Sequence, residues 1–400
     1  MTNSIDQGDV KLAVPINWQE DLLPVLKRNK QFISEVYGKL PFDFVGGGRP
    51  SYSSLPINSK RALGYINKIN KLGLKFNYLL NSNCLNNFEW TRQGQARLTK
   101  LVDWLLQAKV DSVTVAIPYL AEFIKNRYPQ IKIMVSTAAC VDSVDRAKFW
   151  QNLGVEKITL RSIDVNRDFE LLKQIRKNIK CKLQLIVNLN CLYNCAAHMY
   201  HAALISHGSQ CKNNFMIDFP YLSCSYKRIL EPVNFIKGDW IRPEDVHYYE
   251  DIGIDEFKLV DRNMPTENIS LIISAYAQRK YDGNLLDLFP SPKKTLISKS
   301  FGLMHKLKFF FRPLSVNIFK LAAVKDLRFD IFYIDNKALD GFIGHFFEHR
   351  CRVVNCQECG YCAQVGKNVI SVDAKTRINK IRQYSEFINK LVSGEIFRCF

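Results

Sequence analysis

The sequence has no long apolar run, and no stretch approaches the roughly 18 uninterrupted apolar residues that a membrane-spanning helix needs. Its N-terminus, MTNSIDQGDVKLAVPINW, also lacks the basic segment followed by an apolar segment that a secretory signal requires. We therefore expect a cytoplasmic protein, in which thiols stay reduced. The 12 cysteines of the chain then indicate metal binding or redox chemistry rather than disulfide bonds.

Acidic residues are scarce relative to basic ones. The chain contains 38 Asp and Glu against 56 Lys and Arg, which gives a formal net charge of +18 at pH 7. Such an excess favours contact with nucleic acid, anionic lipid or acidic small molecules, although it can also be spread over a solvated surface. Residues 291–328 interleave lysines and arginines with phenylalanines and contain one acid, Asp326. We expect this segment to bind an anionic partner such as RNA or a membrane, or to be a linker whose lysines stay in water.

Short apolar runs alternate with amphipathic stretches along most of the chain. Continuously apolar runs are typical of parallel strands that are covered on both faces, and the stretches between them have the periodicity of helices. This alternation predicts an α/β fold, a TIM-type (β/α)8 barrel, with a doubly wound open sheet as the alternative. The expected strands are Leu12–Val14, Phe42–Val45, Leu74–Leu80, Ser112–Ile117, Ile131–Ser136, Lys157–Leu160, Leu183–Val187 and Phe257–Val260; the expected helices are Trp18–Val36, Ser59–Leu72, Arg92–Ala108, Val144–Leu153, Phe169–Ile179 and Glu267–Arg279.

We expect three regions along the chain. The barrel occupies residues 10–288. Residues 289–345 form a basic aromatic linker followed by an apolar patch. Residues 346–400 form a cysteine-rich metal-binding extension, which ends in a helix at about Ala374–Val392. The character of the sequence changes at the first of these boundaries, where the strand–helix alternation stops.

Polar residues follow several of the expected strands, at the end of a barrel where active sites lie. A triple glycine, Gly46–Gly48, precedes Arg49, while Arg161 and Arg262 follow the sixth and eighth strands. Guanidinium groups bind carboxylates and phosphates through two parallel hydrogen bonds. We therefore predict that Arg49, Arg161 and Arg262 hold an anionic group of a substrate. The glycines lack the spacing of a dinucleotide or P-loop motif, so they predict a close backbone approach or a tight turn.

Four cysteines lie in the expected loop after the seventh strand. Cys191, Cys195, Cys211 and Cys224 have the spacing C-x3-C-x15-C-x12-C. Four thiolates at the mouth of a barrel suit a 4Fe–4S cluster, whereas tetrahedral zinc is the alternative, with a nearby histidine able to replace a sulfur. We predict that these four cysteines bind one metal centre and that it is a 4Fe–4S cluster.

A second group of cysteines lies near the C-terminus. Cys351, Cys356, Cys359 and Cys362 have the spacing C-x4-C-x2-C-x2-C. Consecutive C-x2-C steps resemble the loop of a ferredoxin, whereas zinc sites usually place two such pairs on either side of a longer arm. The compact spacing predicts a second metal site, for which we expect another 4Fe–4S cluster with zinc as the alternative.

The segment NLNCLYNCAAHMYHAALISHGSQC, together with WIRPEDVHYYEDIGIDEFKLVDR farther on, resembles peptidase family U32, the collagenase-like proteins. The cysteine block and the element G-I-x-x-F-K-x-x-x-R, which ends in Arg262, carry the resemblance. It implies a barrel fold and, in the branches similar to the anaerobic ubiquinone and RNA hydroxylases, a 4Fe–4S cluster on four cysteines. Other members are labelled proteases. The E-x-F-x-x-G-[SA]-x-C signature of that branch is absent here, and the C-terminal cysteine group is not part of the family's common core.

These features together predict an iron–sulfur redox enzyme that hydroxylates an aromatic or nucleobase-type substrate, either a small molecule or RNA, without molecular oxygen. The reaction would need an electron-donor protein, and we expect either a homo-oligomer or a hetero-oligomer. A peptidase of the same family is the alternative, although no H-E-x-x-H or G-x-S-x-G signature is present. A second alternative is a non-enzymatic RNA-binding protein whose two cysteine groups bind structural zinc.

Overall fold

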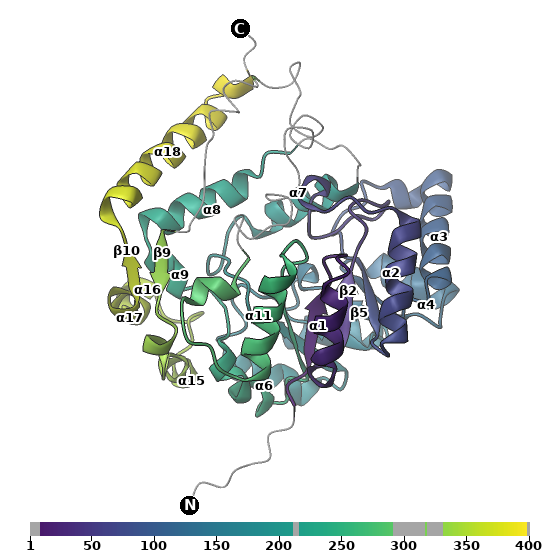
Figure 1. The fold of residues 1–400 in the computed structure, drawn as a ribbon, viewed down its shortest axis with the longest axis horizontal. Coiled ribbons are helices and arrows are strands. Elements are labelled where there is room, and N and C mark those ends of the chain that lie inside the picture. Colours follow the sequence, from purple (N-terminus) through teal and green to yellow (C-terminus); the bar gives the residue numbers. More distant parts are fainter. Residues whose placement is uncertain (1–8, 211–215, 291–316, 318–330, 398–400) are drawn as a thin grey trace, which may run out of the picture.

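The computed structural model describes residues 9–210, 216–290, 317 and 331–397. Eight strands form a closed barrel in chain order, each parallel to the next, and the last strand pairs with the first (Figure 1). The predicted TIM-type (β/α)8 fold is therefore confirmed. The strands are β1 (Leu12–Pro15), β2 (Ile33–Gly38), β3 (Phe76–Leu80), β4 (Ser112–Val115), β5 (Lys132–Val135), β6 (Lys157–Thr159), β7 (Lys182–Ile186) and β8 (Glu256–Lys258).

The lumen of the barrel is polar in its lower layer. Lys157 on β6 forms ion pairs with Glu35 on β2, at 2.8 Å, and with Glu256 on β8, at 2.7 Å. Strand β6 is adjacent to neither partner strand, so these contacts cross the interior of the barrel. Alternate residues on the same strands, such as Val36 and Phe257, belong to the apolar core under the helices. The strands therefore carry charges inward without losing their apolar outer face, and the charges of Lys157, Glu35 and Glu256 balance one another in part.

Four of the helices around the barrel begin after a residue whose side chain caps them. The side chains of Asn58, Thr91, Ser143 and Asp168 each accept a hydrogen bond from the backbone N–H three residues later. Such caps satisfy N–H groups that have no partner within the helix. The helices between the strands are α1 (Leu22–Arg28), α2 (Ser59–Lys71), α3 (Arg92–Gln107), α4 (Pro118–Arg127), α5 (Val144–Asn152) and α6 (Phe169–Asn178), and α11 (Thr266–Ala277) follows β8.

The second strand and the first helix were predicted wrongly. The sequence suggested a helix at Trp18–Val36 and a strand at Phe42–Val45, but β2 starts at Ile33 and α1 ends at Arg28. Asp43 explains the error in the strand, because its carboxylate accepts hydrogen bonds from the N–H groups of Val45 and Gly46 and turns this segment into a loop.

The connection between β7 and β8 is long and helical. It contains α7 (His198–Gln210), α8 (Phe219–Leu230), α9 (Val233–Ile236) and α10 (Val246–Glu250). Three of the four cysteines predicted to bind the first cluster lie in this connection, and the fourth, Cys211, falls outside the described residues.

The C-terminal region packs against this connection. Strands β9 (Phe332–Ile334) and β10 (Ile370–Val372) pair antiparallel, and α18 (Ala374–Val392) lies along α8 while α17 (Tyr361–Val369) contacts α9 (Figure 1). Helices α15 (His345–Glu348) and α16 (Cys356–Cys359) lie between β9 and α17 in the sequence. The predicted basic segment at 291–328 lies outside the described residues, apart from Asn317. No helix within the described ranges is long and apolar enough to cross a membrane.

Candidate functional site

A lysine and a tyrosine face each other at the mouth of the barrel. Lys258, at the end of β8, is buried, and its Nζ lies 4.1 Å from the centroid of the Tyr37 ring. The Tyr37 hydroxyl donates a hydrogen bond to the backbone oxygen of Leu259, at 2.5 Å. Lys258 Nζ forms no hydrogen bond or ion pair with any residue that the structure describes. Burial lowers the pKa of Lys258 to about 8, although the carboxylate of Glu35 acts in the opposite direction.

A second buried lysine lies nearby but is paired. Lys39 forms an ion pair with Asp43, which also accepts a hydrogen bond from the Tyr78 hydroxyl at 2.7 Å. Burial lowers the pKa of Lys39 to about 8, against the effect of Asp43. Because Lys39 has a carboxylate partner and Lys258 has none, Lys258 is the better placed of the two to contact a bound molecule.

Two of the three predicted arginines meet at one carboxylate. Arg49 Nε donates to Asp261 Oδ1 at 2.9 Å. Burial would raise the pKa of Asp261, but Arg49 holds it below its usual value. Arg262 is next in the chain, and burial together with the charge of Arg49 lowers its pKa. Its guanidinium forms no hydrogen bond or ion pair with a described residue, so it can bind an anion or a developing oxyanion.

The third predicted arginine is engaged elsewhere. Arg161 Nη1 lies 2.7 Å from Asp142 Oδ2, and its Nε lies 3.3 Å from Asp164 Oδ1. These carboxylates already neutralise its charge. The structure therefore brings Arg49 and Arg262 together around Asp261, whereas Arg161 belongs to a separate cluster of ion pairs after β6.

The described cysteines of the first group lie close to this mouth. Burial raises the pKa of Cys191 to about 12. The positive charges of Arg228 and Arg49 lower this pKa, and the negative charges of Cys224 and Cys195 raise it further. Arg228, on α8, donates from Nη1 to Cys224 Sγ at 3.3 Å. The three sulfurs therefore share one electrostatic environment, in which burial favours the thiol form of Cys191 and two guanidinium groups act in the opposite direction.

The described part of this group is not a complete metal site. No three Cys, His, Asp or Glu side chains within the described ranges come close enough together to bind a single metal ion. The fourth predicted ligand, Cys211, lies outside those ranges. Sulfur donors beside cationic side chains fit the chemistry of a thiolate-bound cluster, so the predicted metal site stays a prediction.

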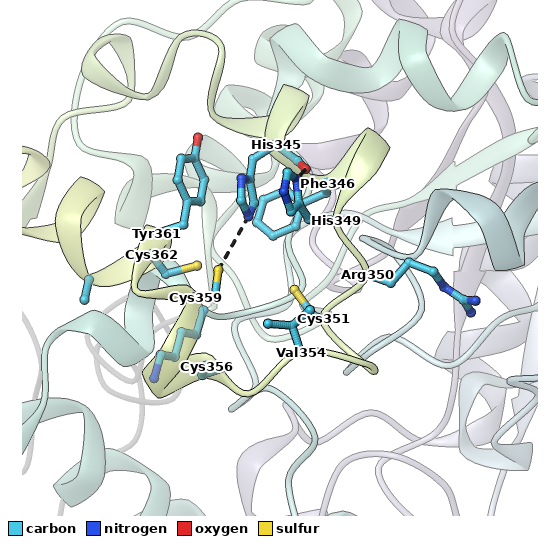
Figure 2. A pocket seen from close by; sticks show the side chains of 12 residues that line it. His345, Phe346, His349, Arg350, Cys351, Val354, Cys356, Cys359, Tyr361 and Cys362 are labelled. Atoms are coloured by element: carbon cyan, nitrogen blue, oxygen red, sulfur yellow. Dashed lines mark hydrogen bonds between the residues drawn. The ribbon is translucent and has the colours of Figure 1, made fainter.

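The second cysteine group surrounds a cavity. Cys351, Cys356, Cys359 and Cys362 all line a cavity of about 200 Å³, together with aromatic and basic side chains. Figure 2 shows that the sulfurs of Cys351 and Cys359 point into this space. His345 Nε2 lies 3.6 Å from Cys359 Sγ. Burial raises the pKa of Cys351 to about 12, and the positive charge of Arg167 opposes this rise.

Sequence reasoning did not single out Lys258 or Lys39 as site residues. For Lys258 the sequence did contain a signal. A lysine inside an otherwise apolar strand must point into the lumen when the other face of the strand is covered by helices. Lys258 follows Phe257 at the end of such a strand, and Glu35 has the corresponding position in β2.

The fold and the site together define an α/β-barrel protein with a cationic mouth and a cysteine-bearing connection after the seventh strand. Residues 81–282 match the model of peptidase family U32. A relative from Methanocaldococcus jannaschii, named "Uncharacterized protease MJ1657", is 30% identical over 366 residues, which cover 91% of this chain and 97% of the relative. The chain belongs to peptidase family U32, as the sequence resemblance implied.

Among solved structures, the chain is similar to one described as the U32 peptidase Mk0906. The identity is 20% and the TM-score 0.48, over 65% of this chain and 97% of the other. A mutant of FabK from Thermotoga maritima matches with 9% identity and a TM-score of 0.33, over 66% of this chain and 68% of the other. The family and the curated relative favour the peptidase alternative over the hydroxylation that the cysteines suggested.

Proposed function

We propose that this chain is a hydrolase of peptidase family U32 that cleaves an amide bond at the mouth of its barrel. The family and the name of the archaeal relative support the reaction class. The observation that carries the proposal is the buried Lys258 beside Arg262, since neither side chain is paired with a described residue. Together they offer a base and an anion-binding group at the end of the barrel where active sites lie.

In this mechanism, neutral Lys258 accepts a proton from a water molecule as the water oxygen attacks the carbonyl carbon. A group with a pKa of about 8 suits this role, because it is partly deprotonated near neutral pH and still basic enough to take the proton. The N–H groups of Arg262 would stabilise the negative oxygen of the tetrahedral intermediate. Lys258 then returns the proton to the leaving amine, so that the C–N bond breaks and the base is restored.

The test is the release of new amino groups from a mixture of unstructured peptides. We expect wild-type protein to release them, and Lys258→Met to lose the activity while remaining folded. Lys60→Met is the matched control, because Lys60 is an exposed lysine on the outer surface of α2. Equal rates in wild type and Lys258→Met would contradict the proposal.

A redox enzyme is the second candidate, and the environment of Cys191 favours it. In this alternative Cys191, Cys195, Cys211 and Cys224 hold a 4Fe–4S cluster, which would supply electron-transfer chemistry when bound. Arg49 and Arg262 would hold an anionic group of an aromatic or nucleobase-type substrate, such as an RNA phosphate, and a separate protein would donate electrons.

One preparation separates the two candidates. Protein purified without oxygen is divided, and a chelator removes the metal from one half. Hydrolysis that persists in metal-free protein supports the amide-cleaving mechanism, because that mechanism uses Lys258, Arg262 and water and needs no metal. Brown protein whose colour is lost in Cys195→Ser, without hydrolysis in either half, supports the redox candidate.

A further inference from the structure

The C-terminal cavity is surrounded by sulfur from a single short segment. Its four cysteines fall between residues 351 and 362, and all of them line the same space of about 200 Å³ (Figure 2). None forms a disulfide with another described cysteine, and Cys356 and Cys359 are exposed to solvent. Four free thiols around one opening are unusual for a structural role, because buried unliganded cysteines normally pack singly as small apolar residues.

The arrangement suits a polynuclear centre better than a single ion. The described residues include no group of three metal-binding side chains close enough to share one ion. The four cysteines instead line a cavity of about 200 Å³, which has room for more than a single ion. An iron–sulfur cluster places several metal and sulfide atoms between its four thiolates, so it fills a space that a lone zinc ion would leave partly empty.

A buried arginine next to the cavity lacks partners for part of its guanidinium group. Arg167 is almost fully buried, and its Nε and Nη2 have no hydrogen-bond partner among the residues that the structure describes. Its guanidinium packs against the ring of Phe346, 5.0 Å from the centroid, and Phe346 itself lines the cavity. The charge of Arg167 acts on both Cys351 and Cys362. Buried N–H groups without partners are costly, and the sulfurs of an anionic cluster would satisfy them.

The segment that bears the cysteines is fixed to the mouth of the barrel. Arg350 Nη2 lies 3.0 Å from Asp168 Oδ2, and Arg352 Nη2 lies 3.3 Å from Asp164 Oδ2. Both carboxylates belong to the loop after β6, so the two ion pairs hold Cys351 between them. A ligand position anchored in this way lowers the entropy lost when a cluster binds.

We propose that Cys351, Cys356, Cys359 and Cys362 bind a 4Fe–4S cluster in this cavity, with Arg167 as a cationic neighbour of its sulfurs. The proposed cluster does not depend on the reaction catalysed by Lys258 and Arg262. It also uses none of the cysteines of the β7–β8 connection, so its metal content can be measured independently of theirs.

The full-length protein is reconstituted without oxygen using iron and sulfide, and its iron content and visible spectrum are measured. We expect the double variant Cys356→Ser/Cys359→Ser to bind about four fewer iron atoms than wild type, as the loss of one 4Fe–4S cluster requires. Cys181→Ser is the matched control and should keep the wild-type content, because Cys181 precedes β7 at the opposite end of the barrel. Cys195→Ser should leave this second site intact.

Thiol labelling of the unmodified chain gives an independent readout if the double variant does not fold. Cys356 and Cys359 are exposed, so iodoacetamide should alkylate them in metal-free protein and not in reconstituted protein. Protection of both, together with the loss of iron in the variant, supports the proposal. Unchanged iron content in a folded variant, equal labelling in both forms, or binding of one zinc ion in place of iron would overturn it.

Discussion

The ammonium group of Lys258 lies 4.1 Å from the centroid of the Tyr37 ring at the mouth of the barrel. A contact of this kind offsets only part of the cost of removing a charge from water. The other buried lysines differ in this respect, since Lys39 pairs with Asp43 and Lys157 with two glutamates. Lys258 is therefore a residue that costs stability at its position, which is typical of side chains that serve a reaction.

Replacing Lys258 with methionine should stabilise the fold. Methionine has a similar shape and no charge, and the pKa of Lys258 falls from 10.5 to about 8 on burial. The unfolded chain thus binds more protons than the folded chain between these two values, so wild-type stability rises with pH across this window. We expect Lys258→Met to gain about 1–3 kcal/mol at pH 7, measured by urea denaturation, and to gain less as the pH approaches 10.5. A loss of stability at pH 7 would contradict this account.

Hydrolysis should increase as Lys258 loses its proton. Below a pH of about 8 the lysine is charged and cannot accept a proton, so kcat/KM should rise through this value and then level off. Lys39 also has a pKa of about 8, and Lys39→Met serves as the control. A rise that persists in Lys39→Met and vanishes in Lys258→Arg would assign the pH dependence to Lys258, and the reverse result would assign it to Lys39.

Replacement of Arg262 and replacement of Arg161 should have different effects on the rate of hydrolysis. Arg262 has no partner among the described residues, so Arg262→Gln should lower kcat by about 100-fold through the loss of oxyanion stabilisation. Arg161 is already paired with Asp142 and Asp164, so Arg161→Gln should change kcat by less than about threefold and reduce stability instead. Steady-state rates and melting temperatures of the two variants measure the contrast.

The sequence was sufficient to predict the barrel because short runs of apolar residues alternate with helical patterns, even where a strand also carries charged side chains, as β6 and β8 do. Strand β2 was missed because Glu35 interrupts its pattern, and Glu35 is tolerated there only because Lys157 reaches it from β6 across the lumen. A contact between residues so far apart in the chain leaves no trace in local periodicity.

The candidate site was predictable only in part for the same reason. Arg49 and Arg262 were expected at the mouth because each follows a strand, but the ion pair of Arg49 with Asp261, the neighbour of Arg262, depends on the closure of β8 onto β1. Arg161 also follows a strand, yet two nearby acids bind it. Strand ends therefore indicate which residues can reach the mouth, and the ion pairs that form there decide which of them remain free to bind a substrate.

Asp168 joins the barrel to the cysteine segment, and its replacement should show both of its roles. Its Oδ1 accepts a hydrogen bond from Leu171 N–H at 3.1 Å, which caps α6, and Arg350 Nη2 lies 3.0 Å from its Oδ2. Arg350→Gln removes only the ion pair, whose arginine is partly exposed, so we expect it to cost less than about 1 kcal/mol. Asp168→Ala also removes the helix cap and should cost about 1–2 kcal/mol more.

Asp168→Ala and Arg350→Gln should both increase the reactivity of Cys351. Loss of either partner frees the backbone next to Cys351, so this partly buried thiol should react faster with iodoacetamide in both Asp168→Ala and Arg350→Gln. Asp168→Asn separates the two roles, because an asparagine oxygen still caps α6 but no longer pairs with the guanidinium. We expect Asp168→Asn to be nearly as stable as Arg350→Gln and equally reactive at Cys351. If labelling of Cys351 followed stability instead, with Asp168→Ala fast and the other two variants like wild type, general unfolding rather than release of the segment would account for it.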